Sequence, residues 1–332
     1  MEYLHKLDLL TAKGKIPEKF AVILKQFYAG YLEALASSVN KESIAVLFDQ
    51  FLDMIVEQIK TPYPFKPFHK SIREPFDYYR YGLNFFRPLV LFEESKVLNL
   101  QYFDEINQFL EKGDNVVLLA NHQTEPDPQA ISLLLEKTHA RLAEDMIFVA
   151  GHRVISDPLC APLSKGRNLL CIFSKKHIEN PPELKEEKQT HNQRTMKQMT
   201  QLLSGGGKCI YVAPSGGRDR MAEDGMIEIA AFDPQSIELF WLLSQHSEKK
   251  THFYPLSLAT YALLPPPQSV DKELGEARHA MRTPIHLALG REIDMDKFPG
   301  SEGLDKRQKR KVRAEYIWGL VKANYKLIST TA

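Results

Sequence analysis

Residues 115–127 read NVVLLANHQTEPD, an apolar run that ends in a polar segment with several titratable side chains. The run at residues 116–120 shows no alternation of polar and apolar positions, which is typical of a strand buried on both faces. Comparable runs lie at residues 146–150, 169–173, 208–213 and 253–258, with helical patterns at 128–137, 192–204 and 234–246. The alternation predicts an α/β fold with a mixed, largely parallel sheet covered by helices.

The first 60 residues differ from the rest because they carry helical periodicity alone. Residues 61–67 read TPYPFKP, with three prolines in seven residues. Regular structure does not continue through so many prolines. We therefore predict a small N-terminal all-helical domain over residues 1–65 and an α/β domain over residues 66–332.

The composition narrows the class of protein. Among 332 residues, 43 are Lys or Arg and 42 are Asp or Glu, a net charge of +1 that argues against a nucleic-acid-binding protein. No uninterrupted apolar run exceeds five residues, so no transmembrane segment is predicted. Three cysteines at positions 160, 171 and 209 match no zinc pattern, and we predict neither a metal nor a cofactor.

His122 and Asp127 are the first candidates for chemistry, because they follow the run at 116–120. Sites in α/β sheets are usually built at the carboxyl ends of strands. His122 can accept a proton near neutral pH, and Asp127 could stabilise the resulting imidazolium. Alternatively, Asp127 only caps the helix that follows it. A second copy of the spacing, His152 to Asp157, makes the H-x4-D pattern weak evidence on its own.

A second candidate site is cationic. Lys176 and His177 follow the run at 169–173, and Arg218 and Arg220 follow the run at 208–213. If these strands are parallel, the four side chains share one edge of the sheet with His122. Such a group could bind a phosphate, for which arginine offers paired donors. The alternative is solvated surface charge beside a glycine turn.

Taken together, these segments resemble the soluble, plastid-type glycerol-3-phosphate 1-O-acyltransferases, a family that also has bacterial members. The resemblance covers most of residues 69–260, in order. The matching stretches are 72–79 (IREPFDYY), 116–127 (VVLLANHQTEPD), 131–138 (ISLLLEKT), 147–153 (IFVAGHR), 157–160 (DPLC), 166–177 (GRNLLCIFSKKH) and 213–220 (APSGGRDR).

The resemblance implies transfer of a fatty acyl group to the sn-1 hydroxyl of glycerol-3-phosphate. It implies His122 as the base, Asp127 as its partner, and acyl-carrier protein or acyl-CoA as the acyl donor. It also implies that the phosphate is held by Lys176, His177, Arg218 and Arg220. The chain has His152 where the family has Asp, which favours His122 as the base, and Pro126 where relatives often have Ala. The bacterial cytoplasm is the predicted compartment, with the plastid stroma as the alternative.

Three other functions are alternatives. A serine-type acyl hydrolase or thioesterase would use Ser215, and a metal-dependent phosphoesterase would draw ligands from both H-x4-D copies. A non-catalytic binding module would use the basic run at residues 306–313 to dock an acidic carrier protein or a membrane surface. The same run is also typical of the solvated face of a helix.

Overall fold

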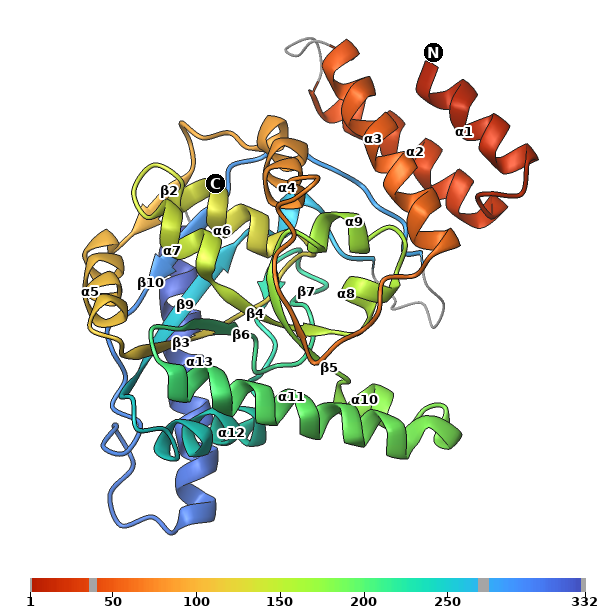
Figure 1. Ribbon diagram of the computed structural model, residues 1–332. Coiled ribbons are helices and arrows are strands. Elements are labelled where there is room, and N and C mark those ends of the chain that lie inside the picture. Colours follow the sequence, from red (N-terminus) through yellow and green to blue (C-terminus); the bar gives the residue numbers. More distant parts are fainter. Residues whose placement is uncertain (1, 36–40, 268–274, 330–332) are drawn as a thin grey trace.

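The computed structural model describes residues 2–35, 41–267 and 275–329, and of Glu2, Lys175 and Lys176 the backbone alone. A mixed sheet occupies the centre, helices cover both of its faces, and three N-terminal helices lie to one side (Figure 1). The helices are α1 Glu2–Ala12, α2 Glu18–Leu35, α3 Lys41–Lys60, α4 Tyr78–Phe86, α5 Leu100–Glu111, α6 Asp127–Leu135, α7 Ala140–Asp145, α8 Arg153–Ser156, α9 Ala161–Ser164, α10 Lys175–Ile178, α11 Lys185–Gly205, α12 Pro234–Gln245 and α13 Lys306–Ser329.

The sheet has the strand order β1-β5-β4-β6-β3-β9-β10-β2, and a separate hairpin pairs β7 with β8. Its strands are β1 Phe68–His69, β2 Lys96–Leu98, β3 Asn115–Ala120, β4 Ile147–Gly151, β5 Asn168–Ile172, β6 Cys209–Val212, β9 Thr251–Ala259 and β10 His286–Leu289. The hairpin consists of β7 Arg220–Met221 and β8 Ile227–Glu228. The five strands β5, β4, β6, β3 and β9 are parallel, whereas β1 and β10 are antiparallel to their neighbours β5 and β9.

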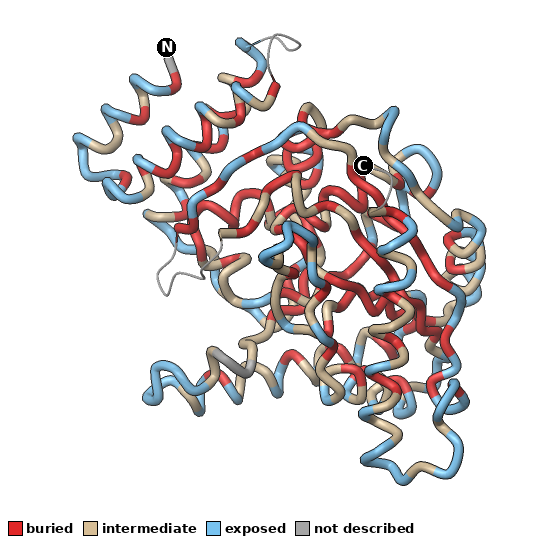
Figure 2. The backbone as a smooth tube through the Cα atoms, turned by 180° about the vertical axis from the view of Figure 1, so that it is seen from behind, coloured by how far each residue is buried: buried red, intermediate tan, exposed pale blue. Residues whose placement is uncertain are grey.

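Every residue of β3 is buried, because helices cover the sheet on both sides. Val116 and Leu118 belong to the hydrophobic cluster that includes residues of α5, α6 and α7. Val117 and Leu119 belong to the cluster that includes residues of α11, α12 and α13. Figure 2 shows buried backbone concentrated at the centre of the molecule. The predicted fold, a largely parallel sheet between helices, is confirmed.

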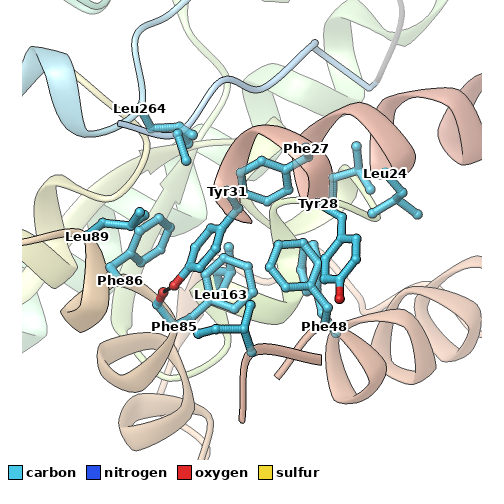
Figure 3. Packing of buried hydrophobic residues seen from close by; sticks show 14 of the residues in the cluster. Leu24, Phe27, Tyr28, Tyr31, Phe48, Phe85, Phe86, Leu89, Leu163 and Leu264 are labelled. Carbon is cyan, nitrogen blue, oxygen red and sulfur yellow. Dashed lines mark hydrogen bonds between the residues drawn. The ribbon is translucent and has the colours of Figure 1, made fainter. Parts of the chain in front are cut away.

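Helices α1, α2 and α3 form the predicted N-terminal helical region. Their aromatic residues share one hydrophobic cluster with residues of α4, α6 and α9 (Figure 3). Phe48 lies 5.2 Å from Phe85 between ring centroids, and the Tyr31 hydroxyl donates a hydrogen bond to the Phe85 carbonyl at 2.5 Å. The division of the chain near residue 65 stays a prediction, since this cluster continues from the helices into the α/β part.

All five predicted sheet strands are present within one or two residues of their expected bounds. The strands β1, β2, β7, β8 and β10 were not predicted, because they are two to four residues long and carry no extended apolar run. Helix α11 begins at Lys185, earlier than expected, since its first turns are polar. None of the helices in the described part of the chain is both long and apolar enough to cross a membrane.

Candidate active site

His122 and Asp127 form a hydrogen-bonded pair just beyond the carboxyl end of β3. The distance from His122 Nδ1 to Asp127 Oδ2 is 2.7 Å. The Asp127 side chain is buried, whereas that of His122 is 31% exposed. Because a carboxylate only accepts hydrogen bonds, we assign the ring proton to Nδ1, which leaves Nε2 as the acceptor. The arrangement provides a proton acceptor that solvent can reach, supported by a buried negative charge.

The Asp127 carboxylate also holds the turn that brings it back to His122. Its Oδ2 accepts a hydrogen bond from the Gln123 backbone N–H at 2.8 Å, and its Oδ1 accepts one from the Thr124 backbone N–H at 3.3 Å. Helix α6 begins at Asp127 itself, with Pro126 in the capping position and no side-chain cap. The alternative that Asp127 merely caps the helix is therefore wrong, because its oxygens face the preceding loop.

Asp219 connects the loop after β6 with the segment that contains His122. Its backbone N–H donates to the His122 carbonyl at 2.7 Å. Its Oδ2 accepts hydrogen bonds from Asn121 Nδ2 at 2.8 Å and from Gln123 Nε2 at 3.3 Å. Since Asp219 stands between the two predicted phosphate-binding arginines, these bonds bring the arginine-bearing loop against the His122 segment.

The Asp219 carboxyl is fully buried, and its titration should be visible in the stability of the protein. Burial raises its pKa from 3.8 to about 6, although hydrogen bonds from Asn121, Ala230 and Gln123 oppose the shift. Between pH 3.8 and about pH 6, Asp219 loses its proton in the unfolded chain but keeps it in the folded protein. The free energy of unfolding therefore falls as pH rises through this range.

We expect wild type to lose up to about 3 kcal/mol of unfolding free energy relative to Asp219→Asn as pH rises through this window. Most of the change is expected between about pH 4 and pH 6. Urea unfolding of both proteins at several pH values measures it. Parallel pH dependences in the two proteins would contradict the prediction.

Arg218 lies beside the His122 segment within a cluster of opposite charges. Its Nη2 is 2.6 Å from Glu276 Oε2, and its Nη1 is 4.0 Å from Glu125 Oε1. Arg278 Nη2 contacts Glu125 Oε2 at 3.0 Å, and Arg153 Nη1 contacts Glu276 Oε1 at 3.4 Å. Among the described residues, three guanidinium groups thus share the carboxylates of Glu125 and Glu276.

Little space remains inside this cluster. Glu125, Arg218, Glu276 and Arg278 help to line a cavity of about 10 Å³, roughly the space of one water molecule. Burial alone would raise the pKa of Glu125, but the positive charges of Arg278 and Arg218 outweigh it and hold that pKa below its ordinary value. The Glu125 side chain is therefore held in its charged form between the two guanidinium groups.

His177 lies in a neighbouring group of cationic side chains, beyond the end of β5. Its ring centroid is 4.9 Å from that of His152. Burial, together with the positive charges of His177, Arg153 and Lys188, lowers the pKa of His152 from 6.5 to about 4. Because His152 adjoins Arg153, which contacts Glu276, this group borders the Arg218 cluster.

The other two predicted phosphate ligands are less completely placed. Arg220 begins β7, and its Nη1 donates to the Pro267 carbonyl at 2.8 Å. The Lys176 side chain lies outside the described residues, although its backbone belongs to α10. The structure thus brings Arg218 to the His122 segment and puts His177 in the bordering group. Phosphate binding by Arg218, Arg220, His177 and Lys176 stays a prediction.

The second H-x4-D copy does not form a pair like the first. Asp157 Oδ1 accepts a hydrogen bond from the Leu159 N–H at 2.9 Å, and its Oδ2 accepts one from the Gly275 N–H at 2.8 Å. His152 instead packs against aromatic rings, including Phe173. Across the described ranges, no group of three His, Cys, Asp or Glu side chains could hold a metal ion. The metal-dependent alternative therefore lacks a ligand set there.

The remaining alternatives are also poorly supported by the contacts. The Ser215 hydroxyl donates to the Gly217 carbonyl at 2.9 Å, and in the described part of the chain no side chain stands as its activating base. The basic run at residues 306–313 opens α13, and part of it is structural. Arg313 is buried with its Nη1 2.6 Å from Glu238 Oε2, and Arg310 contacts the same carboxylate group at 3.8 Å.

Several residues around the pair were not predicted. Asp219 could have been suspected, because a carboxylate between two candidate phosphate ligands is unusual there. Glu276, Arg278 and Thr260 lie in or near the connection from β9 to β10, about 140 to 155 positions after His122. No motif or periodicity indicates that these residues reach the site, because only the packing of β9 against β3 brings them there.

Comparison with known proteins agrees with this geometry. Residues 101–258, which include β3 and the His122 segment, match the Acyltransferase family model. A chloroplastic glycerol-3-phosphate acyltransferase of Cucurbita moschata is 41% identical over 96% of this chain and 70% of its own length. The chain belongs to the glycerol-3-phosphate acyltransferase family.

Two further members of this family have a similar sequence identity to this chain. A second chloroplastic protein of Cucurbita moschata is 45% identical over 85% of this chain and 64% of its own length. The chloroplastic protein of Spinacia oleracea is 44% identical over 80% of this chain and 57% of its own length. A solved 1-acyl-sn-glycerophosphate acyltransferase from Thermotoga maritima aligns over 97% of this chain and 95% of its own, at 15% identity and a TM-score of 0.39.

The three plant relatives bear on the predicted bacterial source and on the predicted compartment. The chain spans between 57% and 70% of their length. All three are chloroplast proteins, so they give no support to a bacterial member or to the bacterial cytoplasm. The alternative of a plastid compartment agrees with the names of these acyltransferases.

Proposed function

We propose that this acyltransferase moves a fatty acyl group from a thioester to the sn-1 hydroxyl of glycerol-3-phosphate, giving lysophosphatidic acid. The observation that carries the proposal is the 2.7 Å contact between the accessible His122 ring and the buried Asp127, at the carboxyl end of a central parallel strand. Acyl-carrier protein and coenzyme A are the two donor classes we propose, since either presents the same thioester. We place the reaction in the plastid stroma.

In the proposed mechanism, His122 acts as a general base and no covalent acyl-enzyme forms. His122 Nε2 takes the proton from the C1 hydroxyl as that oxygen attacks the thioester carbonyl carbon. Asp127 stabilises the imidazolium that results, without taking the proton itself. When the tetrahedral intermediate collapses, the carbon–sulfur bond breaks and His122 returns the proton to the leaving thiolate.

We propose that the phosphate of the substrate is held by Arg218, Arg220, His177 and Lys176. The position of Arg218 beside the His122 segment supports this assignment, because a phosphate bound there would bring the glycerol hydroxyls toward the base. Binding energy from this non-reacting group would be converted into orientation of the reacting hydroxyl. We also keep the two-domain division, with residues 1–65 and 66–332, as part of the proposal.

Glu276 should compete with the phosphate for Arg218, because its carboxylate is 2.6 Å from the guanidinium. Replacing Glu276 with Gln removes this negative charge and leaves the side-chain volume nearly unchanged. We expect Glu276→Gln to lower KM for glycerol-3-phosphate severalfold while kcat changes little, by steady-state kinetics. A raised KM would instead show that Glu276 orients Arg218 for the substrate, and would contradict competition.

The proposed activity is tested by incubating the protein with glycerol-3-phosphate and either palmitoyl-acyl-carrier protein or palmitoyl-CoA. The expected product is 1-acyl-glycerol-3-phosphate, with the free thiol released in equal amount. Regiochemical analysis of the product and comparison of the two donors decide the position acylated and the donor class. Thioester hydrolysis at the same rate without glycerol-3-phosphate would overturn the proposal in favour of a thioesterase.

A further inference from the structure

Beyond His122, one other described side chain donates a hydrogen bond to the Asp127 carboxylate. Thr260 follows β9, and its hydroxyl donates to Asp127 Oδ1 at 2.5 Å. Thr260 is 1% exposed, so water does not replace this bond readily. It lies about 130 residues from the His122 segment in sequence, and it reaches Asp127 because β9 runs parallel to β3 as its neighbour.

The Thr260 hydroxyl is held in place by its own backbone. The Thr260 N–H donates to Gln123 Oε1 at 2.7 Å, and the Tyr261 N–H donates to the same oxygen at 3.0 Å. The Gln123 side chain is fixed from its other end, since its Nε2 donates to Asp219 Oδ2 at 3.3 Å. Thr260 is therefore attached to the His122 segment at two points, one through its backbone and one through its hydroxyl.

The two oxygens of Asp127 accept hydrogen bonds of unequal length. Oδ2 has two short bonds, from the His122 ring and from the Gln123 N–H. Oδ1 has the short bond from Thr260 and a longer one of 3.3 Å from the Thr124 N–H. Without the hydroxyl, a buried charged oxygen would keep only the longer bond. Rotation of the carboxylate toward another donor would then draw Oδ2 away from the His122 ring.

We infer that Thr260 is a positioning residue for the reaction, which acts by holding Asp127 in the orientation that supports His122. The inference rests on the proposed role of His122 as the base. Thr260 contacts neither the guanidinium cluster nor His177 in the described contacts, so its effect should fall on turnover rather than on phosphate binding. The hydroxyl group is the part that matters, and not the methyl group.

The test compares Thr260→Val with Thr260→Ser. Valine keeps the shape of threonine and removes the hydroxyl, whereas serine keeps the hydroxyl. A hydrogen bond to a charged group contributes about 1.5 to 3 kcal/mol, so we expect Thr260→Val to lower kcat by roughly ten- to hundredfold. KM for glycerol-3-phosphate should stay within about twofold, and Thr260→Ser should keep most of the wild-type kcat.

Ser257→Ala is the matched control. Ser257 lies three residues earlier on β9, is fully buried, and donates its hydroxyl bond to the Val321 carbonyl at 2.8 Å instead of to Asp127. Its kcat should stay near the wild-type value. Thermal unfolding of each variant shows whether the fraction of folded protein is comparable, and turnover is expressed per folded molecule.

The inference would be overturned by a Thr260→Val kcat close to wild type, or by an equal loss in Thr260→Ser or Ser257→Ala. His122→Ala is measured in the same series to separate this result from the proposed mechanism. If His122→Ala is inactive while Thr260→Val is fully active, only the positioning role fails. If His122→Ala retains turnover, the general-base mechanism fails, and Thr260 cannot act through it.

Discussion

Replacing His122 with alanine should reduce kcat by about 10² to 10⁴-fold, the usual contribution of a general base. The ring is the accessible member of the pair with the buried Asp127, and it is the group proposed to remove the hydroxyl proton. KM for glycerol-3-phosphate should change little, since the proposed phosphate ligands remain. Steady-state kinetics with varied glycerol-3-phosphate at saturating acyl donor separates the two parameters.

A second histidine–aspartate pair provides the control for this variant. His139 Nε2 is 3.1 Å from Asp104 Oδ1, and the His139 side chain is buried. It lies between α6 and α7, and its partner Asp104 belongs to α5, so the pair is separate from the segment that contains His122. His139→Ala should keep its kcat per folded molecule. Near-normal turnover in His122→Ala would exclude the base role.

Replacing Arg218 with alanine should raise KM for glycerol-3-phosphate by roughly ten- to hundredfold, because a charge-assisted bond to phosphate is lost. The variant also leaves Glu276 without its 2.6 Å partner, and that unpaired charge would repel the phosphate further. Calorimetric titration with glycerol-3-phosphate in the absence of donor measures the affinity directly. The effect on kcat should be smaller than that of His122→Ala.

Two further arginine variants sharpen this test. Arg218→Lys keeps the charge but loses the paired donors, so its KM should fall between those of wild type and Arg218→Ala. Arg141 is a surface residue with a 97% exposed side chain in α7, and Arg141→Ala should have no effect on affinity. An unchanged glycerol-3-phosphate affinity in Arg218→Ala would remove Arg218 from the phosphate site.

The two copies of the H-x4-D pattern illustrate what spacing alone leaves open. Both follow strands and both precede a proline, so the spacing by itself does not distinguish them. In the first, both oxygens of Asp127 turn back to the loop, and Oδ2 meets the His122 ring. In the second, the oxygens of Asp157 bind the backbone of Leu159 and Gly275. The difference depends on which distant segments reach each loop.

Local pattern was sufficient for the central sheet, because a strand buried on both faces is apolar at most of its positions. Residues 116–120 and the comparable runs therefore predicted the parallel strands, and the polar segments after them identified one edge of the sheet as the candidate site. The same loop contains His122 and Asp127, so the sequence offered them as a possible pair, but the spacing alone left open that Asp127 only caps the next helix.

The tertiary structure decided which charges and hydroxyl groups surround that pair. Thr260 and Glu276 are separated from His122 by well over a hundred residues, and their contacts with the Asp127 carboxylate and the Arg218 guanidinium depend on how the strands pack side by side. Hydrogen bonds and ion pairs act over a few ångströms in space, whereas spacing along the chain carries information only about neighbours in sequence. For that reason His122 and Asp127 could be singled out in the sequence, whereas Thr260 and Glu276 could not.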